Sequence, residues 1–107
     1  MGILTGGRIN LNSVIAEILG SSNVYYDPPA SIKMKYPAIR YTIDSAKESK
    51  AENIKYSVFT RYSCTLIDKN ADSEIFKKLL FSPYFHFDRH YVADNLHHFV
   101  FHVWTSE

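Results

Sequence analysis

Apolar side chains recur at helical spacing near the start of the chain, over about residues 10–19. Asn10 or Asn12 is placed to cap the start of this helix, and Gly20 to end it in a left-handed conformation. The residues that form one face are Leu11, Val14, Ile15, Ile18 and Leu19.

A second amphipathic helix is predicted over Ser73 to Leu80. Asp72 is the expected N-cap, and Pro83 prevents the helix from continuing. The apolar face consists of Ile75, Phe76, Leu79 and Leu80.

Strands are predicted where apolar and polar residues alternate. Ile39, Tyr41 and Ile43 share one face of such a segment. In a second alternating segment further along the chain, Tyr62, Cys64 and Leu66 share a face in the same way. The predicted strands cover residues 23–26, 38–44 and 56–67, and two more lie within 84–105 and meet near Asp94 and Asn95.

The predicted order is helix, strand, strand, strand, helix, strand, strand. Hairpin-like links join most neighbours, which favours a single α+β domain over residues 1–107. We expect a sheet of about five strands, mainly antiparallel or else mixed, with two helices packed on it. Residues 1–8 precede these elements and are expected to be flexible.

Residues 45–55 form the most polar stretch and precede the longest predicted strand. At about 3.3 Å per residue, a strand over residues 56–67 extends roughly 40 Å, more than a small domain needs. We therefore expect a polar loop or hairpin arm that projects from the body. Its candidate interaction residues are Lys47, Glu48, Lys50, Glu52 and Asn53.

Length and composition argue against two classes of protein, large cofactor-dependent enzymes and strongly basic nucleic-acid binders. A chain of 107 residues has no room for separate cofactor and substrate domains. Twelve Lys and Arg against eleven Asp and Glu give a net charge of +1, unlike a strongly basic nucleic-acid binder. Aromatic residues make up 15% of the chain, which favours a sheet.

Targeting and redox signals are weak in this sequence. The lone Cys64 cannot form an intramolecular disulfide and is expected to be an inert side chain on the apolar face of its strand. We find no signal-peptide pattern at the start and no apolar run long enough to span a membrane. We therefore expect a reducing compartment and no membrane partner.

All five histidines follow residue 85, which raises the hypothesis of a metal site. His86 and His90 are four residues apart, as are His98 and His102. In a strand this spacing separates two side chains by about 13 Å, so neither pair chelates an ion by itself. We expect no metal ligands unless cross-strand partners complete a site.

A polar cluster among the aromatics offers two interpretations. His90 beside Asp88 resembles an acid/base pair, but no nucleophile motif accompanies it. The favoured interpretation is structural: Asp88, Arg89, Asp94 and Asn95 stabilise turns and pair with one another. We assign no catalytic residue and no cofactor, and expect the protein not to be an enzyme.

Tyr and Phe alternate with basic residues along the predicted strands, as in single-strand nucleic-acid binders. The basic residues are scattered and matched by acids, so an aromatic core beneath a mixed surface is the favoured explanation. Arg40 and Arg61 remain candidates to line a DNA-containing channel if several copies form a ring.

Three segments carry a resemblance to a known family. They are Asn23-Val-Tyr-Tyr-Asp-Pro-Pro-Ala-Ser-Ile-Lys-Met-Lys-Tyr-Pro-Ala-Ile-Arg-Tyr41, Leu66-Ile-Asp-Lys-Asn-Ala-Asp-Ser-Glu-Ile75 and Phe87-Asp-Arg-His-Tyr-Val-Ala-Asp-Asn-Leu96. With their order and spacing, the chain resembles head–tail joining, tail-completion or tail-terminator proteins of long-tailed phages and prophages, over about residues 9–104. It departs from the usual pattern at His97 and His98 and in the run that follows.

The resemblance implies a small subunit that forms a ring, as a hexamer, at the head–tail junction of the virion. Such a ring caps the tube of the major tail protein, docks to the head connector or stopper protein, and lets phage DNA pass through its lumen. Assembly takes place in the cytoplasm of the bacterial host, and the family implies no enzyme activity and no cofactor. In this context the arm reaches a neighbouring subunit or the tail tube.

Overall fold

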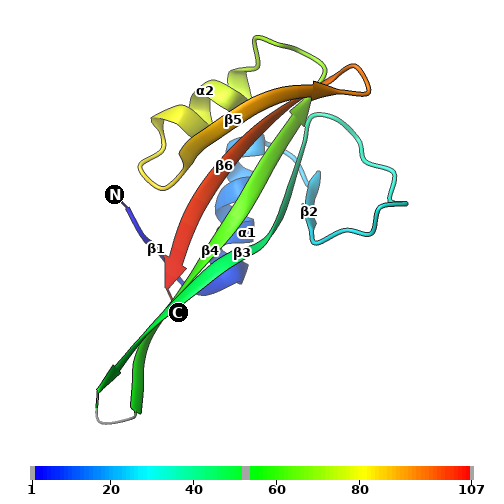
Figure 1. Ribbon diagram of the computed structural model, residues 1–107. Helices are drawn as coiled ribbons and strands as arrows, with labels where there is room; N and C mark the ends of the chain where they lie inside the picture. The colour runs from blue at the N-terminus through cyan, green and yellow to red at the C-terminus, as the bar shows by residue number, and fades with distance from the viewer. Residues whose placement is uncertain (1, 52–53, 107) are drawn as a thin grey trace.

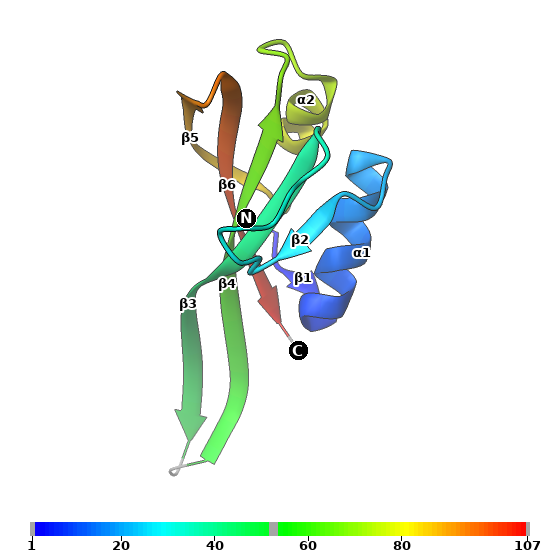
Figure 2. The same cartoon turned by 90° about the vertical axis from the view of Figure 1, so that its right-hand side faces the viewer.

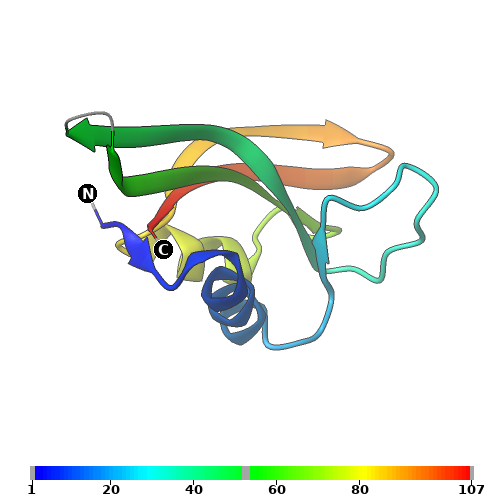
Figure 3. The ribbon, with the colours of Figure 1, turned by 90° about the horizontal axis from the view of Figure 1, so that it is seen from below.

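The computed structural model describes the backbone of residues 2–51 and 54–106, and the side chains of residues 2–48 and 57–106. The domain is α+β, as predicted, with two helices and a curled sheet of six strands (Figure 1). The two helices lie on the same face of the sheet (Figure 3). We call the other side the open face.

The sheet is mixed rather than mainly antiparallel. Its antiparallel part joins β3 (Ala38–Ala51), β4 (Ile54–Asp68), β6 (Leu96–Ser106) and β5 (His86–Ala93) in that order. Two short edge strands run parallel to their neighbours: β2 (Val24–Tyr26) beside β3, and β1 (Leu4–Thr5) beside β6. The periodicity of a strand does not specify the direction of its partner, so these parallel pairings were not predicted.

Regular structure begins before the first predicted helix. Leu4 and Thr5 pair with the end of β6, and Leu4 is only 5% exposed in the core. Helix α1 (Gly7–Leu19) begins three residues earlier than the predicted start. Its N-cap is Gly6, with φ of 93°, and not Asn10 or Asn12.

Single residues determine where α1 ends and where α2 begins. Gly20 ends α1 with φ of 76°, the predicted left-handed conformation. Helix α2 (Glu74–Phe81) is capped by Ser73, whose Oγ accepts a hydrogen bond of 3.3 Å from the Phe76 amide. The predicted cap Asp72 instead forms a 3.2 Å ion pair with Lys77.

The core lies between the helices and the sheet. Tyr62, Cys64 and Leu66 of β4 are buried there, as their alternation predicted. Phe76 of α2 stacks on Phe99 of β6 with ring centroids 4.4 Å apart, which joins this helix to the sheet. Some of the many aromatic side chains of this sequence therefore pack in the core.

Two residues, Asp94 and Asn95, connect β5 to β6 in a tight hairpin. Asp94 and Asn95 both have positive φ, 54° and 62°, as a two-residue type I′ turn requires. The two predicted strands therefore meet at the predicted residues.

Candidate functional site

The arm is a two-stranded ribbon formed by residues 45–51 of β3 and 54–58 of β4. The last pairing of β4 with β6 joins Phe59 to Ser106, so β4 residues before Phe59 pair with β3 alone. Figures 1 and 2 show this ribbon running away from the body, whose extents with the arm are 52, 31 and 23 Å. Isolated two-stranded ribbons are marginally stable in water, so contact with a further surface would stabilise the arm.

The expected arm residues fall on different parts of this ribbon. Lys47 and Glu48 are neighbours on β3 and so point to opposite faces. Lys50 is paired with Lys55 in the backbone register, and its side chain lies outside the described set. Glu52 and Asn53 lie outside the described residues altogether.

The two faces of the arm differ in chemistry. On the open face, the Nζ atom of Lys47 lies 5.1 Å from the centroid of the Trp104 ring, a cation–π contact with the body. On the helix side, Val58 is 42% exposed and Glu48 lies directly opposite it. Ile43, 57% exposed, continues this apolar face at the base of the arm, where it pairs with Tyr62.

A polar network crosses four strands of the open face. Arg61 of β4 pairs with Asp44 of β3 at 2.7 Å, and Arg89 pairs with Asp88 on β5 at 2.6 Å. His102 of β6 lies between the two carboxylates, with Nδ1 3.1 Å from Asp44 and Nε2 3.3 Å from Asp88. Only the contact with Asp88 has hydrogen-bond alignment; the Asp44 contact is an ion-pair distance without it.

The network neutralises the positive charges of Arg61 and Arg89 on the open face. The guanidinium groups of Arg61 and Arg89 each share an aspartate with His102, so neither presents an unpaired positive charge. Exposed pairs of this kind contribute about 0–1 kcal/mol each, so the network orders side chains more than it stabilises the fold. Its register depends on the β-bulge at Asp44, between Ile43 and Ser45.

The other sequence candidates are separated by the fold. Arg40 lies on the open face beside a pocket of about 420 Å³ that Tyr36 and Asp94 also line. No ion pair of Arg40 is found within the part of the chain that the structure describes. Asp94 and Asn95 form the turn at one end of β5, whereas Asp88 and Arg89 lie near its other end, so the expected cluster divides into two.

The histidines do not form a multidentate site. His90 Nε2 lies 3.0 Å from His97 Nδ1 across the β5–β6 hairpin, so a cross-strand pair exists that the sequence did not reveal. Among residues 2–48 and 57–106, whose side chains are described, no group of three or more His, Cys, Asp and Glu is placed to hold a metal ion. Burial raises the pKa of the Cys64 thiol far above its usual value, which disfavours the reactive thiolate.

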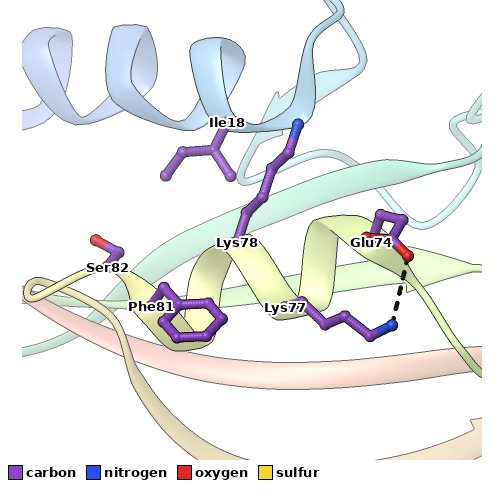
Figure 4. Close-up of a pocket in the computed structure, with 6 residues that line it drawn as sticks. All are labelled: Ile18, Glu74, Lys77, Lys78, Phe81 and Ser82. Carbon is purple, nitrogen blue, oxygen red and sulfur yellow. Dashed lines mark hydrogen bonds and ion pairs between the residues drawn. The ribbon is translucent and has the colours of Figure 1, made fainter.

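Sequence analysis missed an apolar groove between the two helices, which we call the α1–α2 groove. It has a volume of about 570 Å³ and is lined by Ile18 of α1 and by Glu74, Lys77, Lys78, Phe81 and Ser82 (Figure 4). Phe81 is 89% exposed. Its position directly after the apolar face of α2 and before Pro83 was the one available signal.

The two lysines of the groove differ in their partners. Lys77 forms a 3.2 Å ion pair with Asp72 and donates a 3.4 Å hydrogen bond to Glu74, and these carboxylates raise its pKa. Figure 4 shows Lys78 extending from α2 toward the end of α1, across the groove. No ion pair of Lys78 is found among the described side chains.

Comparison with known proteins does not assign the chain to a family. None of the described helices is long and apolar enough to cross a membrane. No family model matches the chain, and no curated protein matches it significantly.

Proposed function

We propose that the protein is a structural subunit of the head–tail junction of a tailed phage, most specifically a tail terminator or tail-completion protein. In this role identical copies form a ring, taken to be a hexamer, on the end of the tail tube. The ring contacts the major tail protein on one side and the head connector or stopper on the other. Phage DNA passes through its lumen.

The arm is the observation that carries this proposal. A ribbon that leaves the body with Ile43 and Val58 exposed gains stability only when a further surface covers it. A subunit of a ring has such a surface on its neighbour. The paired guanidinium groups of Arg61 and Arg89 fit a lumen that lets DNA pass without holding it, if the open face lines the channel.

Removing the arm tests the proposal. Ala46 and Thr60 are cross-strand neighbours, so a two-residue Asn-Gly turn can replace residues 47–59 and close the shortened hairpin. We expect full-length protein to form rings in negative-stain electron microscopy and the shortened variant to remain a folded monomer by circular dichroism and light scattering. Asn95→Gly, which changes only the other hairpin turn, serves as the control and should still form rings.

Two results oppose the proposal. Rings that survive loss of the arm would remove its central observation. A full-length protein that stays monomeric at micromolar concentration, alone and with tail-tube protein, would contradict a ring-forming role.

A sequence-tolerant nucleic-acid-binding module is the second candidate. Trp104 on the open face favours it, because Lys47 and Arg61 lie 5.1 and 5.8 Å from its ring centroid and together resemble a stacking platform. A gel-shift assay with single-stranded DNA separates the two functions. Tight binding that weakens steeply with salt supports the module, whereas no retardation at 50 mM salt opposes it.

A further inference from the structure

A pocket of about 420 Å³ lies at the end of the sheet where β3 begins and β4 ends. One wall is the loop of residues 27–37, which joins β2 to β3, and another is the β5–β6 turn at Asp94. Figures 1 and 3 show this loop and this turn at the same end of the sheet. Arg40 of β3 and Ile67 of β4, which is only 5% exposed, complete the lining. The fold thus encloses a cavity that the proposed function does not use.

Hydrogen bonds hold the loop of residues 27–37 at both of its ends. The Asp27 amide donates a 2.9 Å hydrogen bond to a carbonyl of β3, and the Asn23 side chain donates one of 3.3 Å to the Pro37 carbonyl. Within the loop, the Ile32 amide donates a 3.1 Å hydrogen bond to the Pro29 carbonyl. This wall is therefore formed before any ligand arrives, which lowers the entropic cost of binding.

Arg40 differs from the other three arginines of the chain in its contacts. Arg8 lies 4.5 Å from the centroid of a tyrosine ring, and Arg61 and Arg89 pair with aspartates at 2.7 and 2.6 Å. Within residues 2–48 and 57–106, the Arg40 side chain has no ion pair and no ring contact. A guanidinium group donates to two oxygens of a phosphate or carboxylate at once. Arg40 therefore offers the pocket a site for an oxyanion.

Asp94 and Tyr36 give the same pocket a hydrogen-bond acceptor and an aromatic surface. No ion pair joins Asp94 to Arg40 in the described part of the chain, so the two charges are not spent on each other. Acidic side chains accept hydrogen bonds from ribose hydroxyl groups in nucleotide sites. The Tyr36 ring is 37% exposed, and nucleic-acid bases stack on such rings.

We propose that this pocket binds a ribonucleoside monophosphate, with the phosphate on Arg40, the ribose hydroxyl groups on Asp94 and the base against Tyr36. A volume of about 420 Å³ lies in the range of pockets that hold ligands of this size. A free amino acid has charges to match Arg40 and Asp94, but it is smaller and leaves the aromatic wall unused. The inference goes beyond the proposed function and does not rest on it, because a monomer contains the whole pocket.

Calorimetric titration with AMP tests the site. We expect a dissociation constant of about 10 μM to 1 mM, in the range of a small ligand at a partly exposed pocket. Adenosine lacks the phosphate and should bind about tenfold or more weakly. The deoxynucleotide dAMP lacks the 2′-hydroxyl group and should bind about fivefold more weakly. Inorganic phosphate and leucine, titrated separately, should each bind more weakly than AMP.

Substitutions assign each contact in the same assay. Arg40→Ala should raise the dissociation constant of AMP about tenfold or more. Asp94→Asn keeps a residue that tolerates the positive φ of the turn and should remove the preference for AMP over dAMP. Tyr36→Leu should weaken binding about fivefold, whereas Tyr36→Phe should retain it. Lys47→Ala, beside Trp104, is the matched control and should change the dissociation constant less than about twofold. Circular dichroism checks that each variant is folded.

Three results overturn the inference. The first is no heat of binding with AMP at about 1 mM. The second is phosphate or leucine that binds as tightly as AMP, which identifies a simple anion or zwitterion site. The third is binding lost in Lys47→Ala and kept in Arg40→Ala, which places the nucleotide at Trp104 instead.

The proposed function is tested separately. Absence of AMP binding leaves a ring-forming role standing, because rings are scored by electron microscopy without nucleotide. AMP binding that depends on Arg40 in a protein that forms no rings supports the pocket and opposes the role.

Discussion

Ser73 and Asp72 are adjacent at the start of α2 and have different roles. Both residue types are common N-caps, and periodicity alone predicted Asp72. The structure assigns the cap to Ser73, whose Oγ reaches the Phe76 amide, while Asp72 pairs with Lys77 at the surface. The predicted and observed N-caps differ by one residue, and sequence periodicity does not locate the start of a helix to within one residue.

The difference between these two residues is measurable. Ser73→Ala should lower the free energy of unfolding by about 1 kcal/mol, because the Phe76 amide loses its acceptor. Asp72→Ala should lower it by less than about 0.5 kcal/mol, because its ion pair is solvent-exposed. Urea denaturation followed by circular dichroism measures both, and equal losses would contradict the assignment of the cap.

At the scale of elements, local periodicity predicted the helices and the long strands well. Alternation placed Tyr62, Cys64 and Leu66 in the core because only side chains two apart share a face. The parallel pairings of β1 and β2 escaped prediction because they join segments distant in sequence. The α1–α2 groove escaped for the same reason: Ile18 and Phe81 meet only after both helices pack on the sheet.

The β5–β6 hairpin makes an element-level prediction. Asn95 has φ of 62°, a conformation that asparagine and glycine tolerate and β-branched residues do not. Asn95→Val should therefore lower the free energy of unfolding by about 1–2 kcal/mol, whereas Asn95→Gly should change it by about 0.5 kcal/mol or less. Chemical denaturation provides the comparison, and a valine variant as stable as the glycine variant would refute the strained turn.

At the scale of the whole molecule, the open face and the arm could be predicted only in outline. The sequence indicated a polar arm and basic residues at Arg40 and Arg61. It did not indicate that Asp44 neutralises Arg61, because that pair depends on a β-bulge and on the register of β3 with β4. The charge that the open face presents is thus a property of the folded sheet and not of the composition.

Self-assembly should couple the stability of the domain to its concentration. An assembly that binds only folded subunits stabilises each by mass action, by about 1 kcal/mol for a tenfold rise in concentration. For a domain of this size that raises Tm by about 4 °C. Thermal melts of the full chain from 1 to 100 μM should therefore shift upward, while the variant with residues 47–59 replaced by Asn-Gly should melt at one temperature throughout. A concentration-independent Tm for the full chain would contradict assembly through the folded arm, and a parallel shift in both proteins would place the contact on the body instead.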